Sequence, residues 1–501
     1  MVNPGITQRQ LEGALWDAAN ALRGPIDPAD FKTYVFPVLF FKWIDDTWQL
    51  HRRQAVADFG DALTDEIEAD YHPFTVPEGC HWTDVRDAKP GTLGATLQKV
   101  LQKLEQANPD KLANVFGDAQ WANTDRLPER ALRDLIDAFH RLGSLDPDHV
   151  PNDLLGGAYE YLLRQFADES GKKAGEFFTP RAVVRLLVKL LDPKVGETVY
   201  DPACGSGGML VETIGQVRED GQDPRRLRLY GQEVSLTTSA IARMNLFIHD
   251  IEDFQIVRGD TLRDPKLRAP DGKIRTFDVV IANPPFSLKN WGADEWAADP
   301  RAKGGVPPAG NGDFAWVQHM VASMTPDGGR VGIVMPHGAL FRAGAEAAIR
   351  QHLIETDQLE TVVGLPKNLF YSTSIPACIL LFRTTKPADR KGHVLFIDGS
   401  HRFTAGRNQN TMDEADLAAI ATAHITGEDP DEGDGVSVRL VPHEEIEANG
   451  WDLNISRYIT SAIEEGVDVT TALAQLRDAE QALRAAETAM WDRLEAAGYD
   501  F

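Results

Sequence analysis

The spacing of apolar residues divides the chain into regions of different structure. From Ile6 to about Asn152 apolar residues recur three and four positions apart, which is typical of amphipathic helices. The nearly uninterrupted apolar run at residues 36–44 is far shorter than the roughly 20 residues that cross a bilayer, so we expect a buried helix there. This part of the chain is predicted to be an all-helical domain.

After Lys173 the pattern changes to short β-branched runs that alternate with helical stretches. Such alternation is typical of an open, mainly parallel α/β sheet, in which ligands bind at the carboxyl ends of the strands. We therefore expect binding loops after the first four strands. The predicted strands cover residues 198–200, 227–230, 255–258, 278–282, 330–335, 359–363, 377–382 and 394–397.

The C-terminal part shows two further patterns. The stretch from Gly427 to Gly435 is acidic and rich in glycine, which predicts a loop or linker. Between residues 469 and 497 the pattern is helical, and Leu476, Leu483 and Met490 stand seven positions apart, as in a heptad seam. That seam suits a helix folded onto its own domain as well as one that pairs with a partner chain.

Length and pattern together predict several domains, since a domain takes about 150 residues. We assign the C-terminal helix to contact with a partner subunit. The predicted regions are a helical domain at 1–152, an α/β domain at 153–425, a linker and C-terminal extension at 426–468, and a C-terminal helix at 469–501.

The charge balance limits what the chain does alone. Its 51 basic and 76 acidic residues give a net charge of −25, whereas a self-sufficient DNA binder usually has a basic surface. Three cysteines exclude a disulfide framework and a cysteine-based zinc site, which fits a reducing cytoplasm. Residues 1–20 lack the order of a signal peptide, so we expect a soluble cytoplasmic protein with no membrane partner.

A glycine-rich loop follows the first predicted strand, in the sequence Asp201-Pro-Ala-Cys-Gly-Ser-Gly-Gly208. Glycines at 205, 207 and 208 allow a tight turn and a close approach of the backbone to a ligand. Such a loop alone can also cradle a phosphate or be a plain turn between strand and helix.

Two acids favour a nucleoside ligand. Glu233 ends the second strand, where a carboxylate can accept both hydroxyls of a ribose, and Asp260 ends the third, where it can accept from the amine of an adenine. Either acid alone is more often a helix cap or a surface charge. Cys204 lies inside the turn with no histidine nearby in sequence, so we expect it to pack there and not to act as a nucleophile.

The most specific stretch is Phe277-Asp-Val-Val-Ile-Ala-Asn-Pro-Pro-Phe286, a β-branched strand that ends abruptly in Asn-Pro-Pro-Phe. The Asn283 side-chain oxygen and the Pro284 carbonyl can draw a planar amine toward tetrahedral geometry and prepare it for direct attack on a sulfonium methyl. Pro285 stiffens the turn, and Phe286 can stack on a base flipped out of the duplex. No metal and no covalent intermediate are required. The alternative is a rigid turn that only terminates the strand.

With these residues in view, the chain resembles the methylation subunit of type I restriction-modification systems, a family of adenine-N6 DNA methyltransferases. The likeness covers nearly the whole chain and implies a Rossmann-like S-adenosylmethionine-dependent methyltransferase fold. Beyond the two loops it rests on Leu155-Gly-Gly-Ala-Tyr-Glu-Tyr-Leu162, Gly175-Glu-Phe-Phe-Thr-Pro-Arg181, Gly310-Asn-Gly-Asp-Phe-Ala-Trp316 and Trp451-Asp-Leu-Asn-Ile-Ser-Arg-Tyr458.

The resemblance implies S-adenosyl-L-methionine as cofactor and assigns residues to its parts. Glu233 would hold the ribose and Asp260 the adenine. The methionine part would lie against Phe178, Thr179, Pro180, Asp201, Gly205 and Gly207, and Ser206 and Thr261 complete the predicted set.

The family also implies partners: DNA as substrate, a specificity subunit shared by two methylation subunits, and a restriction subunit for cleavage. Two alternatives stay open. Asn-Pro-Pro loops also serve methyltransferases of glutamine amides and RNA amines, whose nitrogens are planar too, and a chain with this fold can be a non-catalytic scaffold.

Overall fold

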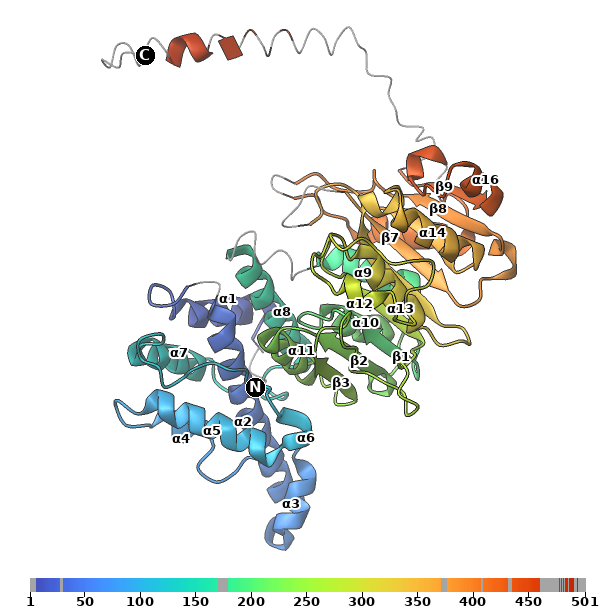
Figure 1. Ribbon diagram of the computed structural model, residues 1–501. Helices are drawn as coiled ribbons and strands as arrows, with labels where there is room; N and C mark the ends of the chain where they lie inside the picture. The colour runs from blue at the N-terminus through green and yellow to red at the C-terminus, as the bar shows by residue number, and fades with distance from the viewer. Residues whose placement is uncertain are drawn as a thin grey trace. The chain divides into compact units, whose positions relative to one another are not determined.

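The computed structural model describes residues 6–27, 30–169, 179–370, 376–406, 409–430 and 435–459, with separate positions between 477 and 493 (Figure 1). The chain forms two compact units, residues 1–458 and residues 459–501. In the second unit the described positions between 477 and 493 are helical, and the side chains of Leu483 and Met490 are exposed, at 60% and 47%. Leu476 of the predicted seam lies outside the described residues.

The N-terminal part of the first unit is helical, as predicted. Its longest helix, α2, contains the apolar run at residues 36–44, and every one of these side chains is buried. Among the residues described, no helix is both long and apolar enough to cross a membrane. The helices are α1 (Gln8–Asn20), α2 (Phe31–Phe59), α3 (Asp65–Tyr71), α4 (Trp82–Arg86), α5 (Leu93–Ala107), α6 (Pro109–Leu112), α7 (Glu129–Arg141) and α8 (Asn152–Glu169).

The core of this helical part continues into the next part of the chain. Phe36 packs on Tyr159 of α8 with ring centroids 4.5 Å apart, and Phe40 stacks on Phe247 of α11 (Leu236–Ile248) at 5.9 Å. Because α11 also flanks the sheet, one apolar cluster joins the helical part to the α/β part. The pattern of apolar spacing did not predict this shared core.

A single nine-stranded sheet forms the α/β part, in the order β3-β2-β1-β4-β5-β7-β6-β8-β9. Five of the eight strand pairs are parallel, which confirms the predicted mainly parallel sheet. The strands are β1 (Thr198–Asp201), β2 (Arg228–Glu233), β3 (Phe254–Arg258), β4 (Val279–Ala282), β5 (Arg330–Pro336), β6 (Leu359–Gly364), β7 (Ala377–Arg383), β8 (His393–Asp398) and β9 (Ser437–Pro442).

All eight predicted strands are present, and β9 is an addition. It lies in the region predicted as a linker and C-terminal extension, and it pairs antiparallel with β8 from Ser437 to Pro442. Its side chains are largely exposed or half-buried, as at the edge of a sheet, so its sequence lacks the continuous apolar run that marks the inner strands. No strand was predicted for these residues.

Helices cover both faces of the sheet. On one face α9 (Arg181–Leu191), α10 (Gly208–Glu219) and α15 (Glu414–Thr426) enclose an apolar core that includes Val199 of β1. The neighbouring Tyr200 points to the opposite face, where its hydroxyl lies 3.1 Å from His319 of α13 (Asp313–Ala322). The carboxyl ends of β1 to β4 therefore meet between two helical layers.

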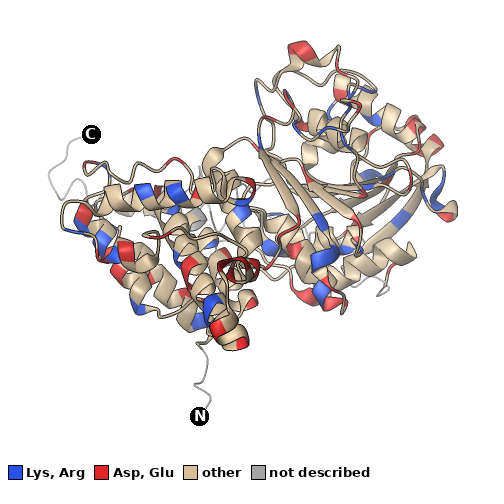
Figure 2. Ribbon diagram, turned by 90° about the horizontal axis from the view of Figure 1, so that it is seen from below, with Lys and Arg blue, Asp and Glu red and all other residues tan. Residues whose placement is uncertain are grey.

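Acidic and basic side chains are interspersed over the described part of the chain. Figure 2 shows Lys and Arg next to Asp and Glu on both the helical part and the α/β part, and no broad basic face is visible in this view. This distribution agrees with the net charge of −25.

Candidate active site

The loop after β1 turns through two left-handed glycines. Gly205 has φ of 53° and Gly207 has φ of 82°, a region of backbone space that L side chains rarely adopt. A Cβ at Gly207 would also meet Ala242 of α11 at 3.4 Å. The turn delivers the chain into α10, which begins at Gly208 with Gly207 as its N-cap.

Asp201 occupies the end of β1 and is 2% exposed. Its Oδ1 accepts a hydrogen bond from the backbone N–H of Ala203 at 2.9 Å, which fixes the first step of the loop. Burial, together with the nearby Glu233 carboxylate, raises the pKa of Asp201 to about 8. A positively charged group bound beside this carboxyl would lower its pKa again.

Glu233 connects the second strand to the glycine loop. Its Oε2 accepts from the N–H of Gly205 at 3.1 Å and its Oε1 from the N–H of Ser235 at 2.8 Å. The side chain is buried, and burial raises its pKa. Glu233 thus holds the loop against β2, in addition to the ribose contact predicted for it.

Asp260 and Thr261 follow β3. Asp260 caps its own turn, since its Oδ1 accepts from the N–H groups of Leu262 and Arg263, both at 3.1 Å. Thr261 is buried, and its hydroxyl donates to the Pro202 carbonyl at 2.6 Å. This bond joins the loop after β3 to the loop after β1, so the predicted adenine contact is held at a fixed place beside the glycine loop.

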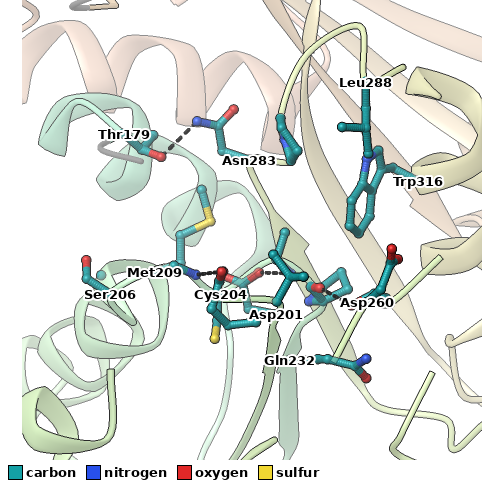
Figure 3. A pocket seen from close by; sticks show the side chains of 18 of the residues that line it. Thr179, Asp201, Cys204, Ser206, Met209, Gln232, Asp260, Asn283, Leu288 and Trp316 are labelled. Atoms are coloured by element: carbon teal, nitrogen blue, oxygen red, sulfur yellow. Dashed lines mark hydrogen bonds between the residues drawn. The ribbon is translucent and has the colours of Figure 1, made fainter. Parts of the chain in front are cut away.

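These loops enclose a cavity of about 390 Å³. A cavity of this size is within the range of small-molecule sites. Figure 3 shows Thr179 and Asn283 on one side of it, Asp201 and Gln232 on another, and Asp260 near Trp316 and Leu288. The predicted residues that line it are Thr179, Asp201, Gly205, Ser206, Glu233, Asp260, Thr261, Asn283 and Pro285.

Other predicted residues lie behind the cavity wall or outside the described residues. Pro180 is buried as the N-cap of α9, Gly207 serves the turn, and Pro284 is buried at the end of β4. Phe286 is half-buried, and its ring meets that of Phe370 at 6.0 Å and 61°. Phe178 falls outside the residues that the structure describes.

Asn283 is held through the nitrogen of its side-chain amide. Its Nδ2 donates to the Thr179 hydroxyl at 2.8 Å (Figure 3), while its Oδ1 is buried and accepts no hydrogen bond from any described residue. A buried polar atom without a partner is rare in folded proteins, because it has lost its hydrogen bonds to water. The oxygen predicted to accept from the substrate amine is therefore available for that bond.

Cys204 also lines the cavity, yet it is not suited to nucleophilic attack. The side chain is 5% exposed, and burial raises the pKa of its thiol well above the ordinary value. A thiol, unlike a thiolate, is a poor nucleophile. The prediction that Cys204 packs in the loop is confirmed.

Sequence reasoning missed several lining residues. Gln232 is fully buried, its amide joining the backbone of Asp264 and Lys266 at 3.1 Å and 2.9 Å. Trp316 comes from α13, and its Nε1 has no hydrogen-bond partner among the described residues. The Gly310–Trp316 motif pointed to Trp316, but the motif did not show that this residue lines the cavity. Only the fold brings α13 to the cavity. The remaining lining residues outside the predicted set are Val184, Pro202, Ala203, Gly208, Met209, Val234, Gly259 and Leu288.

Comparison with known proteins bears on both parts of the chain. Residues 150–466 match the model of the N-6 DNA Methylase family. Residues 11–139 match the model of the HsdM N-terminal domain. The two matches cover the α/β part and the helical part.

Two curated proteins and one solved structure illustrate the likeness. The chain is 34% identical to the type I restriction enzyme MjaVII methylase subunit of Methanocaldococcus jannaschii, over 77% of this chain and 67% of that protein. It is 30% identical to the MjaIX methylase subunit of the same organism, over 95% and 90%. A crystal structure of the type I restriction-modification methyltransferase subunit from Streptococcus thermophilus superimposes with a TM-score of 0.79 and 30% identity, covering 91% of this chain and 100% of that one.

Proposed function

The chain belongs to the N-6 DNA methylase family, as a methylase subunit of a type I restriction enzyme, and on that premise we propose which residues carry its reaction. The enzyme transfers the methyl group of S-adenosylmethionine to the N6 amine of adenine in DNA, and it works in a multi-subunit complex. The assignments of residues, domains and stoichiometry that follow are our proposals.

The cavity residues fit the chemical groups of this cofactor. Asp201 offers a buried carboxyl beside backbone N–H groups, which suits the ammonium of the methionine part. Asp260 at the opposite end suits an adenine amine, and Glu233 lies between them in the order of the strands. Phe178, Thr179, Pro180, Ser206, Gly207 and Thr261 complete the set. When bound, the cofactor supplies an electrophilic methyl group on a positively charged sulfur.

The observation that carries the catalytic assignment is the Oδ1 of Asn283, which is buried and accepts no hydrogen bond from the part of the chain that the structure describes. Because Thr179 fixes the amide nitrogen, this oxygen is oriented as an acceptor for the adenine N6–H. The Pro284 carbonyl is the second acceptor. Together they would draw the amine lone pair out of the ring plane, toward the methyl group that the bound cofactor would supply. The proton that the amine then loses passes to solvent.

Phe286 is proposed to stack on the flipped adenine. Its ring is half-buried and rests edge-on against Phe370, so one face can be uncovered by a small rotation of the side chain. Pro285 is exposed at the rim of the cavity and keeps the loop stiff while the base enters.

We divide the chain into a helical domain at 1–152, the methyltransferase domain at 153–425, a C-terminal extension at 426–468 and a partner-binding helix at 469–501. The exposed Leu483 and Met490 support the last assignment, because an apolar seam is stabilised when a second helix covers it. The partner is a specificity subunit that reads the DNA sequence, shared by two copies of this chain, and a restriction subunit completes the enzyme. The net charge of −25 supports this dependence on another chain for DNA affinity.

The test is methyl transfer from radiolabelled S-adenosylmethionine to duplex DNA, with and without a co-expressed specificity subunit. We expect N6-methyladenine in the DNA only when both subunits are present. Label that appears in protein or RNA, or in cytosine, would contradict the proposal.

A further inference from the structure

The residue that follows the catalytic Asn-Pro-Pro-Phe turn is held by a buried carboxylate. Ser287 has φ of 52°, in the left-handed region, and its N–H donates to Oδ1 of Asp313 at 2.7 Å. Asp313 begins α13 and is 2% exposed. A strained residue keeps its conformation only where its surroundings fix it, so this bond determines where the turn ends.

The same carboxylate is paired with an arginine that follows β5 in the chain, whereas Asp313 precedes β5. Arg342 donates to Oδ2 of Asp313 and also forms an ion pair with Glu346, which is 1% exposed. Two buried carboxylates therefore share one guanidinium. Removing one member of such a group leaves an uncompensated buried charge, so its members hold each other in place.

A second arginine extends this chain of bonds to the end of the first unit. Arg350 is 2% exposed and donates to the carbonyls of Arg342 at 2.7 Å and of Trp451 at 2.9 Å. Nearby, the N–H of Leu453 donates to the Leu340 carbonyl at 2.8 Å. The Trp451-Asp-Leu-Asn-Ile-Ser-Arg-Tyr458 segment is thus fixed to the loop that carries Arg342, directly before the second unit begins.

We propose that Asp313 is a positioning residue for Asn283, and that Arg342 and Arg350 connect it to the Trp451-to-Tyr458 segment. The position of the Trp451-to-Tyr458 segment then sets the position of the catalytic turn at residues 283–286. Because the chain continues from Tyr458 into the region assigned to the specificity subunit, binding of that subunit has a physical route to the rate of methyl transfer. This inference rests on the proposed role of Asn283.

The sequence contains a matched control. Arg383 and Glu360 form an ion pair of the same kind at 2.7 Å, with side-chain exposures of 30% and 3%. The corresponding exposures for Arg342 and Asp313 are 30% and 2%. The control pair joins β6 to β7 and has no bond to the catalytic turn among the described contacts. Arg342 has a second carboxylate partner, Glu346, so the two variants are compared per folded enzyme. A purely structural role predicts the same kcat per folded enzyme for Arg342→Gln and Arg383→Gln.

The experiment measures kcat, KM for DNA and cofactor affinity of the assembled complex. Asp313→Ala should lower kcat about 100-fold, the effect of a displacement of roughly 1 Å, with an unchanged cofactor affinity. Asp313→Asn keeps an acceptor for Ser287, so it should retain more of kcat than Asp313→Ala. Arg383→Gln should keep kcat within about twofold of the wild type.

Arg350→Gln tests the connection to the C-terminal segment. As a single variant it should lower kcat. The double variant Asp313→Ala with Arg350→Gln should be no slower than Asp313→Ala, because both changes break the same chain of bonds. Additive losses, an undiminished kcat in Asp313→Ala, or an equal loss in Arg383→Gln would overturn the proposal. Asn283→Ala measured alongside separates the two claims: if it is inactive while Asp313→Ala is normal, only the positioning role fails.

Discussion

The side-chain nitrogen of Asn283 donates to the hydroxyl of Thr179 at 2.8 Å, across the mouth of the cofactor cavity. Thr179 stands just before α9 and Asn283 just after β4, so the contact joins segments far apart in the chain. Since an amide offers a nitrogen and an oxygen on opposite sides, fixing one orients the other. Thr179 therefore gives the oxygen that we propose as catalytic its direction.

This orientation is open to a direct test at Thr179. Thr179→Val preserves the shape of the side chain but removes the acceptor, and should lower kcat by roughly 5- to 10-fold, the value of one neutral hydrogen bond of about 1 kcal/mol. Thr179→Ser restores the hydroxyl and should restore most of the rate. Single-turnover methyl transfer at saturating cofactor measures both. Equal rates in the two variants would exclude the orienting role.

Asp201 is predicted to make stability depend on pH. Its pKa is raised from 3.8 to about 8 in the folded state, so the folded protein holds this proton more tightly than the unfolded chain does. Its contribution to stability is complete below about pH 4 and is lost progressively as pH rises to about 8. Asp201→Asn removes the titration and should stabilise the ligand-free protein at pH 8 by at least about 1 kcal/mol, near the free energy of one pKa unit.

Denaturant unfolding of both proteins at several pH values from 4 to 8 gives this difference directly. The advantage of Asp201→Asn should vanish toward pH 4, while its cofactor affinity should be lower than that of the wild type. A stability difference that does not change with pH would contradict the raised pKa.

Replacing Glu233 should weaken cofactor binding and leave kcat at saturating cofactor unchanged. Glu233→Ala removes the acceptors of the Gly205 and Ser235 N–H groups as well as the predicted ribose contact. Cofactor affinity should fall by roughly 10- to 100-fold, as expected when hydrogen bonds to a charged group worth about 1.5–3 kcal/mol are lost. Calorimetric titration with S-adenosylhomocysteine measures the affinity, and kcat at saturating cofactor is the control. A variant with normal affinity would show that Glu233 serves the loop alone.

Cys204 should be dispensable for the chemistry. Burial keeps it in the thiol form, and no described contact brings a base to it, so Cys204→Ala should retain methyl transfer within about threefold after correction for any loss of cofactor affinity. The measurement is the single-turnover rate at saturating cofactor. An inactive variant with intact cofactor binding would instead indicate a covalent mechanism.

The exposed seam of the C-terminal helix is predicted to bind the specificity subunit. Replacing Leu483 and Met490 by Asp should abolish co-purification with that subunit, because a charge in an apolar seam is costly to bury. Cofactor binding by the isolated chain should not change, which distinguishes lost assembly from lost folding. Intact assembly would place the partner contact elsewhere.

The sequence predicted those parts of the site that local chemistry determines. The glycine loop after Asp201 requires its left-handed residues, and the prolines after Asn283 end their strand whatever lies around them. Trp316, Gln232 and the bond from Thr179 to Asn283 could not be predicted, since only the packing of distant elements brings them together.

In the fold, too, some features are predicted by the local sequence and others depend on packing between distant elements. Inner strands such as β4 are buried on both faces and read as continuous apolar runs, so all of them were predicted. Both edge strands, β3 and β9, are only partly buried; β3 was predicted, whereas β9 carries too weak a pattern. The packing of Phe40 against Phe247, which joins the helical part to α11, depends on tertiary structure that apolar spacing does not encode.

The central claim is that the free oxygen of Asn283 activates the adenine amine, and Asn283→Ala tests it most directly. In the assembled complex, the single-turnover rate of N6-methyladenine formation should fall by about 100- to 1000-fold, the range for loss of one preorganised electrostatic contact. Cofactor affinity should stay close to that of the wild type. A variant that methylates adenine at an undiminished rate would contradict the account.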